Sequence, residues 1–179
     1  MSRPITAHLF HSVNGVVEDP HLWQFDAFGA EEGQLMSTSI REVTDAVVGR
    51  TLWQEWSEHW PQADDPFAAW INPLRKHVLS TTLPSDLPWN STLVSSDPLD
   101  YIRELREQGE GGISVLGGIE TIRSLFLTGL IDELTLTTHP VIASGRRLFD
   151  DSVPTTRLEL VSSTQTAVGN AVLTYGLRA

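Results

Sequence analysis

The sequence contains no cysteine among its 179 residues. A chain without thiols cannot form disulfides, use a cysteine nucleophile or bind a metal through thiolates. Zinc-dependent base deaminases also require a His-x-Glu and a Pro-Cys-x-x-Cys pattern, and neither occurs here. The histidines do not supply another metal site, because His8 and His11 have odd spacing on one expected strand and face opposite sides. We therefore expect no metal.

Basic residues are scarce, with 12 Lys and Arg against 23 Asp and Glu, which gives a formal net charge of −11. A surface this acidic repels nucleic-acid backbones and anionic lipids, so we expect neither as a partner. A few backbone N–H groups and one arginine can still create a local site for an anionic cofactor. The sequence also lacks an uncharged apolar run of about 18 residues, and its N-terminus leads directly into an expected strand. We expect a cytoplasmic protein.

The length and the ordinary composition, 40% hydrophobic and 20% charged, predict one folded domain over residues 1–179. Short runs rich in apolar and β-branched residues predict strands at 5–13, 46–48, 74–82, 91–96, 112–118 and 131–143. Two final strands are expected within 157–178, joined around Gly169-Asn170. We expect Lys76, in the middle of its strand, to face solvent.

Helices are predicted at 39–45, 51–60, 97–109 and 119–130, and residues 16–35 are expected to form a loop with a short helix. Trp53, Trp56 and Trp60 share one face of the second helix, which indicates packing in the core or at a dimer interface more than a binding cage. Strands that alternate with helices predict an α/β fold with a mainly parallel sheet and an antiparallel C-terminal edge.

Two glycines follow the strand at 112–118 and precede a helix. Unpaired N–H groups and the helix dipole favour an anion at such a helix start, and the missing Cβ atoms of Gly117 and Gly118 allow close approach. A tight structural turn explains the same pattern. Gly49-Arg50-Thr51 forms a second strand-to-helix junction, with a guanidinium and a hydroxyl that suit phosphate. A local salt bridge of Arg50 is the alternative.

The stretch from Ser114 to Phe149 combines the Gly-Gly turn and its helix with Gly-Leu-Ile-Asp-Glu-Leu, Pro-Val and Gly-Arg-x-Leu-Phe. This combination resembles the signature of the RibD C-terminal domain family, the reductase domain of a bacterial riboflavin-biosynthesis protein. The resemblance extends more loosely over the whole chain. It implies a dihydrofolate-reductase-like fold of three layers, with a mainly parallel central sheet, helices on both faces and an antiparallel C-terminal hairpin.

The resemblance also implies NADPH as cofactor. Gly117 and Gly118, joined by a cis peptide in such folds, would meet the pyrophosphate, and the polar strand end at 80–82 would hold the adenosine 2′-phosphate. The implied cofactor-binding residues are Gly49, Arg50, Thr51, Ser80, Thr81, Thr82, Leu116, Gly117, Gly118, Ile119, Glu120 and Thr121.

For the substrate, the resemblance points to the loop after the first strand. The family phrase Ser-x-Asp-Gly corresponds here to Ser12-Val13-Asn14-Gly15, so a charged contact made by the aspartate in relatives would be neutral in this chain. The implied substrate-binding residues are Asn14, Gly15, Asp19, Trp23 and Asp26. No catalytic residue is identified.

Taken together, the resemblance implies an NADPH-dependent reductase that transfers hydride directly to a small substrate, as 5-amino-6-(5-phosphoribosylamino)uracil reductase does. A dihydrofolate-reductase-like enzyme and a nucleotide-binding module without turnover are the alternatives, because fold alone does not decide function. We also expect a homodimer, from the resemblance and from the many large aromatic residues.

Overall fold

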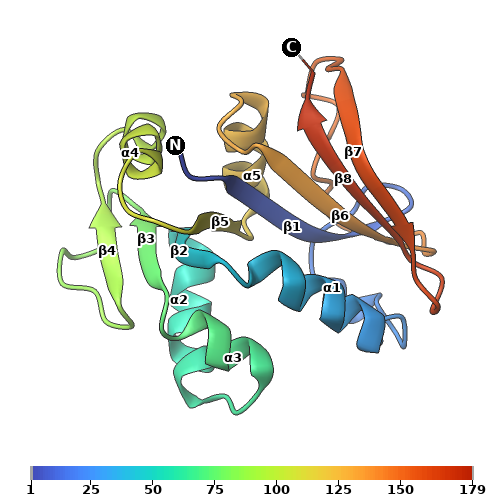
Figure 1. The fold of residues 1–179 in the computed structure, drawn as a ribbon, viewed down its shortest axis with the longest axis horizontal. Helices are drawn as coiled ribbons and strands as arrows, with labels where there is room; N and C mark the ends of the chain where they lie inside the picture. Colours follow the sequence, from blue (N-terminus) through green and yellow to red (C-terminus); the bar gives the residue numbers. More distant parts are fainter. Residues whose placement is uncertain (1, 179) are drawn as a thin grey trace.

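The structure, a computed structural model, describes residues 2–178 and centres on one eight-stranded sheet (Figure 1). The strand order is β4-β3-β2-β5-β1-β6-β8-β7. The strands are β1 (Ile5–Ser12), β2 (Val43–Gly49), β3 (Arg75–Leu79), β4 (Ser91–Val94), β5 (Gly112–Leu116), β6 (Glu133–His139), β7 (Leu158–Gln165) and β8 (Ala171–Leu177). Strands β1 to β6 pair in parallel, whereas β8 is antiparallel to both β6 and β7. The predicted sheet and C-terminal hairpin are confirmed.

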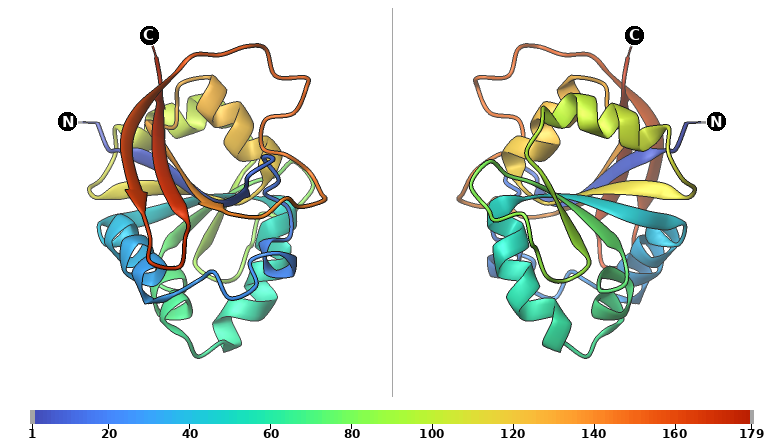
Figure 2. Two further views of the ribbon diagram at one scale, coloured as in Figure 1. Left: turned by 90° about the vertical axis from the view of Figure 1, so that its right-hand side faces the viewer. Right: turned by 90° about the vertical axis from the view of Figure 1, so that its left-hand side faces the viewer.

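Helices cover both faces of this sheet (Figure 2). One group covers one face and a second group covers the other, which confirms the three-layer arrangement (Figure 2). The first pair is α4 (Pro98–Arg106) and α5 (Ile119–Leu127), and the second group is α1 (Ala30–Ile40), α2 (Arg50–His59) and α3 (Pro66–Ile71). Short 3₁₀ turns lie at Pro20–Leu22 and Trp60–Gln62. No helix within residues 2–178 is long and apolar enough to cross a membrane.

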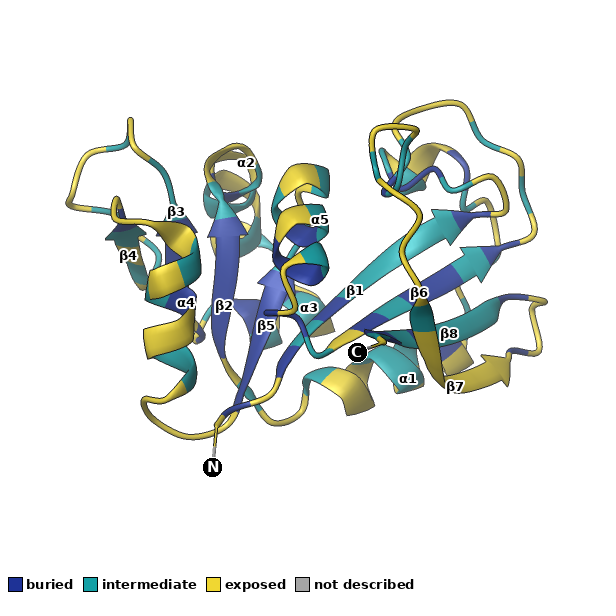
Figure 3. Ribbon diagram, turned by 90° about the horizontal axis from the view of Figure 1, so that it is seen from above, coloured by how far each residue is buried: buried dark blue, intermediate teal, exposed yellow. Residues whose placement is uncertain are grey.

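The main core lies between the sheet and helices α4 and α5. Ile113 of β5, Ile122 of α5 and Phe126 of α5 are each fully buried in it. Figure 3 shows that β2 and β5 are buried along most of their length, whereas β7 at the sheet edge is exposed. Burial on both faces explains why the central strands read as continuous apolar runs in the sequence.

The helix predicted before residue 46 is wrong, whereas the strand predicted at 46–48 is confirmed with an earlier start. The helix expected at 39–45 instead spans Ala30–Ile40, and the Glu32 carboxylate accepts from the N–H of its N-cap residue, Gly29, at 2.9 Å. The strand expected at 46–48 begins earlier, at Val43, and pairs with both β3 and β5. Asp45 made this segment look helical, because a charge inside a buried strand breaks the apolar pattern. Its partners come from elsewhere in the chain, so local sequence could not reveal them.

Asp45 is the centre of a polar network that joins β2, β3 and the segment before β1. Its carboxylate accepts hydrogen bonds from Arg3 and, at 2.8 Å, from Arg75, and it lies 2.9 Å from His77 Nε2. His77 Nδ1 in turn lies 2.8 Å from the Tyr101 hydroxyl of α4. Burial alone would raise the pKa of Asp45, but the hydrogen bonds from His77 and Arg3 outweigh it and lower the pKa to about 2.

Lys76 was expected to face solvent, and this prediction is wrong. Only 1% of the residue is exposed. Its ammonium donates to the carbonyl oxygens of Asn72 at 3.0 Å and Leu74 at 2.8 Å, and it lies 4.2 Å from the centre of the Trp89 ring. Burial lowers its pKa to about 8. Carbonyls at the end of α3 and an aromatic face therefore replace water around this charge.

The tryptophans of α2 pack inside the molecule. Trp53 is buried against Val48 and Val78. Trp56 packs edge to face against Phe67 and against Trp60, which follows the helix, and Trp60 contacts Phe67 at a tilted angle. These contacts within the molecule confirm that Trp53, Trp56 and Trp60 pack against its core. The homodimer stays a prediction.

We predict that Asp45→Asn lowers the free energy of unfolding by about 3–5 kcal/mol, because it leaves the buried Arg3 without its countercharge. The folded-state pKa of Asp45 is depressed, so its contribution is complete above the unfolded pKa near 4 and is lost as the pH falls towards 2. Urea unfolding between pH 2 and pH 7 measures both effects. Asp100→Asn, which removes an exposed pair with Arg103, should cost less than about 1 kcal/mol. Equal losses in the two variants would contradict this assignment.

Candidate functional site

The three segments predicted to bind the cofactor meet at one edge of the sheet. Strands β3, β2 and β5 are neighbours and run parallel, with Val48 opposite Leu116 and Gly49 opposite Leu79. Their carboxyl ends therefore lie side by side, and α2 and α5 start there directly (Figure 3). Ligands of open α/β sheets bind outside such carboxyl ends.

The starts of α2 and α5 differ from those of the other α-helices in the described chain. Asp65 and Asp97 accept hydrogen bonds from the first N–H groups of α3 and α4. At α1 the carboxylate of Glu32 accepts from the N–H of the N-cap residue Gly29, although no side chain caps the first N–H groups of the helix itself. At α2 and α5 the N-cap residues are Gly49 and Gly118, and no side chain accepts from these helix starts. Two neighbouring sets of N–H groups thus remain available to an anion.

The glycines at this edge leave little room for side chains. A Cβ on Gly117, which has a φ of 45°, would lie 2.3 Å from Leu52 Cδ2. A Cβ on Gly49 would lie 3.2 Å from Thr121 Oγ1. Gly118 also has a positive φ, of 74°. The expected cis peptide between Gly117 and Gly118 is wrong, because no bond in residues 2–178 is cis, and positive φ angles at both glycines make the turn.

Arg50 and Thr51 are exposed at the first turn of α2. Within residues 2–178 the Arg50 guanidinium has neither an ion pair nor a hydrogen bond, so the alternative of a local salt bridge is not observed. An unpaired guanidinium beside two uncapped helix starts forms a positive site on a chain of net charge −11.

The remaining predicted cofactor residues surround this site. Ser80 follows β3 and its hydroxyl accepts from the N–H groups of Thr82 at 3.1 Å and Leu83 at 3.2 Å, which forms a tight turn with Thr81 and Thr82 exposed. Leu116, Ile119 and Thr121 are half-buried where β5 meets α5. Glu120 is exposed, and its carboxylate pairs with Arg146 at 2.6 Å.

Asn14 connects two loops at the other end of the same edge. Its amide donates to the Ala143 carbonyl at 2.8 Å and accepts from the Ala143 N–H at 3.0 Å. An ionised aspartate could not donate a hydrogen bond. Asparagine in place of the family's aspartate therefore suits this pair of hydrogen bonds. Gly15 adopts a φ of 90° in the same turn.

The other residues predicted for the substrate do not gather around one point. Asp19 and Asp26 are exposed, and neither side chain has a hydrogen bond within the described chain. Trp23 is buried, donates from Nε1 to the Glu18 carbonyl at 2.8 Å and packs edge-on against His139. Of this set, Trp23 alone joins the structured part of the site.

His8 was not predicted from the sequence, because the histidines were considered there only as metal ligands. Ala7 pairs with Val115, so the following residue, His8, lies level with Leu116, just before the Gly-Gly turn. Its Nε2 lies 2.7 Å from Thr137 Oγ1, and Nδ1 has no partner in the described residues. Burial lowers the pKa of His8 to about 4, so the ring is neutral at pH 7. A histidine between Ala7 and Leu9 in an otherwise apolar strand was the available signal.

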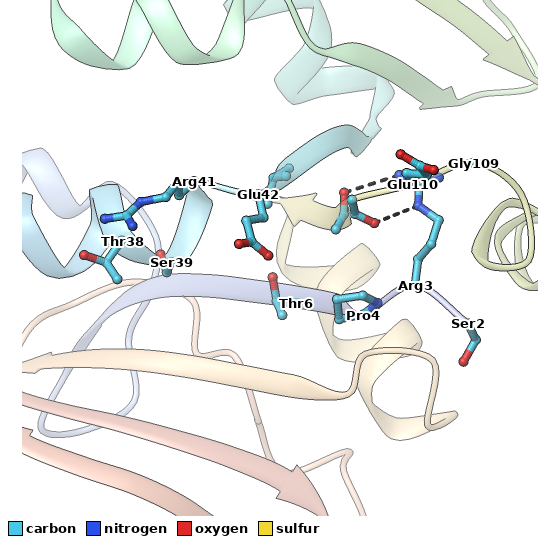
Figure 4. A pocket seen from close by; sticks show the side chains of 13 residues that line it. Ser2, Arg3, Pro4, Thr6, Thr38, Ser39, Arg41, Glu42, Gly109 and Glu110 are labelled. Carbon is cyan, nitrogen blue, oxygen red and sulfur yellow. Dashed lines mark hydrogen bonds between the residues drawn. The ribbon is translucent and has the colours of Figure 1, made fainter.

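A hollow lies elsewhere, at the amino ends of the parallel strands (Figure 4). It has a volume of about 810 Å³ and lies between the start of β1, the end of α1 and the turn before β5. Its walls carry both signs of charge, from Arg41, Glu42 and Glu110, and Arg3 is already bonded to the Gly111 carbonyl at 2.9 Å. None of the predicted site residues lines it.

Known proteins resemble this chain in sequence and in fold. The curated protein YyaP of Bacillus subtilis (strain 168), described as uncharacterized, is 23% identical over 142 residues, which cover 76% of this chain and 75% of that protein. A putative riboflavin biosynthesis protein from Shewanella sp. PV-4 superposes with a TM-score of 0.72 at 20% identity, with both chains covered completely.

Two further solved structures indicate the breadth of this fold. Dihydrofolate reductase from Enterococcus faecalis, complexed with NADP(H), has a TM-score of 0.67 at 15% identity and full coverage of both chains. The deaminase/reductase from Thermotoga maritima has a TM-score of 0.70 at 13% identity, covering 99% of this chain and 57% of that one. The fold is therefore dihydrofolate-reductase-like. The model of the RibD C-terminal domain matches residues 3–172, and the chain belongs to that family.

Proposed function

We propose that the chain is an NADPH-dependent reductase that transfers hydride to a small substrate. The observation that carries this proposal is the pair of uncapped helix starts at Gly49 and Gly118, with the unpaired Arg50 beside them. This arrangement suits a ligand with several phosphate groups, as NADPH is. Membership of a reductase-domain family supports the same proposal.

The residues present fit the proposed cofactor. The N–H groups that open α5 after Gly118 would bind the pyrophosphate, because the turn has no Cβ in the way. Arg50 and the hydroxyls of Thr81 and Thr82 would bind the 2′-phosphate that distinguishes NADPH from NADH. When bound, NADPH supplies the hydride, and the protein supplies binding and orientation.

His8 is our candidate for the group that faces the reacting end of the substrate. Hydride addition to a C=O or C=N bond places negative charge on the heteroatom, which needs a hydrogen-bond donor or a proton. When His8 Nε2 accepts from the Thr137 hydroxyl, the neutral ring carries its proton on Nδ1, the atom without a partner. His8 would then hold the substrate heteroatom by donation from Nδ1.

For the cofactor, we predict that Arg50→Ala weakens NADPH binding roughly tenfold or more, because a lost charge-assisted hydrogen bond costs about 1.5–3 kcal/mol. NADH, which lacks the 2′-phosphate, should lose little. Titration calorimetry measures both affinities. Equal losses would remove Arg50 from the 2′-phosphate, and no binding of either cofactor by the wild-type protein would end the proposed function.

We predict that Gly118→Ala reduces NADPH affinity more than tenfold, because its Cβ would occupy the space of the pyrophosphate. The backbone strain of alanine at positive φ costs about 1–2 kcal/mol and lowers the melting temperature by only a few degrees. Gly129→Ala is the matched control, with a φ of 76° at the opposite end of α5. It should lose similar stability and keep its NADPH affinity. Full affinity in folded Gly118→Ala would disprove the pyrophosphate assignment.

We predict that His8→Leu lowers the rate of NADPH oxidation roughly a hundredfold and leaves the NADPH dissociation constant unchanged. The rate is measured with a panel of carbonyl and imine heterocycles. His11→Leu is the control, because His11 is on the opposite face of β1 and bonds Thr138 at 3.2 Å. An unchanged rate in His8→Leu would exclude His8 from the reaction. NADPH binding without oxidation of any compound by the wild type would favour a nucleotide-binding module.

A further inference from the structure

The part of the chain that surrounds His8 and Trp23 contains no lysine or arginine over a long stretch. Between Arg3 and Arg41 the sequence has five carboxylates and no strong cation. The five are Glu18, Asp19, Asp26, Glu31 and Glu32. This stretch includes β1, the loop that follows it and all of α1. This stretch around His8 and Trp23, the substrate side of the proposed site, is therefore built from acidic and neutral residues.

Arginines that reach this region from later in the chain are already paired. Arg146 pairs with Glu120 at 2.6 Å, and Arg147 pairs with Asp151 at 3.0 Å. Arg123 pairs with Asp150 at 2.8 Å. Each of these arginines is paired with a carboxylate. Arg50, at the carboxyl ends of β2, β3 and β5 (the cofactor edge), has no such partner within residues 2–178. A phosphate group on the substrate would have to compete with these carboxylates for the arginines.

The other groups that bind anions are also occupied or neutral here. Glu32 Oε2 accepts the N–H of Gly29 at the start of α1, so this helix end holds a carboxylate of the protein itself. Burial lowers the pKa values of His8 and His139, and both rings are neutral at pH 7. His11 is shifted in the same direction by burial. No charge on this side favours a dianion.

Aromatic side chains form a continuous wall beside His8. Phe10 lies 5.7 Å from His8, 5.8 Å from His139 and 5.7 Å from Phe28, as measured between ring centres. Trp23 extends the wall with its edge contact to His139. Phe28 is 45% exposed, so part of this wall is open to a ligand. Aromatic rings of this kind bind a flat apolar ring by stacking or edge contact.

From the charges and the wall together, we infer that the substrate is an uncharged or cationic compound with an aromatic ring and without a phosphate group. This inference rests on the proposed reductase function. It separates the chain from the Thermotoga maritima relative, whose described substrate, 5-amino-6-(5-phosphoribosylamino)uracil, is a phosphate ester. Phosphate binding belongs to the cofactor edge with Arg50, and ring binding belongs to the aromatic wall.

The test uses two pairs of compounds that differ only in a phosphate. They are 5-amino-6-(ribosylamino)uracil with its 5′-phosphate, and 4-hydroxybenzaldehyde with 4-formylphenyl phosphate. NADPH affinity is measured first, and calorimetry of each compound follows with the free protein and with the NADPH complex. We expect the unphosphorylated member of at least one pair to bind about tenfold more tightly or better, because like charges disfavour the dianion. Added salt should reduce the difference.

A charge reversal tests the electrostatic origin of this preference. Asp26→Lys should reduce the preference at least about threefold, since it places a cation two residues from Phe28 of the aromatic wall. Asp64→Lys is the matched control, because Asp64 is also exposed and lies in the loop before α3, and its substitution changes the net charge by the same amount. It should leave the preference unchanged.

The outcomes separate this inference from the proposed function. Tighter or equal binding of the phosphorylated members, or no binding of any of the four compounds, overturns the inference while NADPH binding still supports the cofactor site. An equal effect of Asp26→Lys and Asp64→Lys overturns the electrostatic argument. Absence of NADPH binding to the wild-type protein is instead a failure of the proposed function.

Discussion

Parallel pairing of β2 between β3 and β5 is the constraint on which the site depends. It places the ends of three strands at one edge of the sheet, and two helices start there at once. Asp45 supports this arrangement from inside, because it bonds Arg3 next to β1 and Arg75 and His77 of β3. The proposed anion site is therefore a consequence of strand order, and the glycines at its helix starts keep it accessible.

The molecule divides its charges between the two parts of the proposed site. The cofactor edge has the unpaired Arg50 and helix starts that no side chain caps. The substrate side has carboxylates, neutral histidines and arginines that are already paired. A strongly negative chain can thus bind a polyanionic cofactor locally and still disfavour an anionic substrate a short distance away.

Local signals in the sequence were sufficient for most of the elements. Asp97 and Pro98 mark the start of α4, and the structure confirms that Asp97 accepts from the N–H groups of Leu99 and Asp100. The two Gly-rich junctions predicted the edge at which the helices begin. The same signals failed where a charged residue was buried, as at Asp45 and Lys76, because the partners that stabilise each charge come from other segments. The start of α1 was missed because its cap uses Glu32 and not the N-cap side chain.

The sequence by itself determined the fold class, the strand-to-helix glycine junctions and, through the combination of motifs from Ser114 to Phe149, the family. These features depend on short-range chemistry, such as capping, turn preference and hydrophobic periodicity, and short-range chemistry can be seen in a linear chain. Only the tertiary structure decided that Arg50 has no partner within residues 2–178 and that His8 lies beside the Gly-Gly turn. It also decided that the arginines near the substrate side are paired. The reason is that each of these properties is set by residues distant in sequence, which meet only when the sheet has assembled.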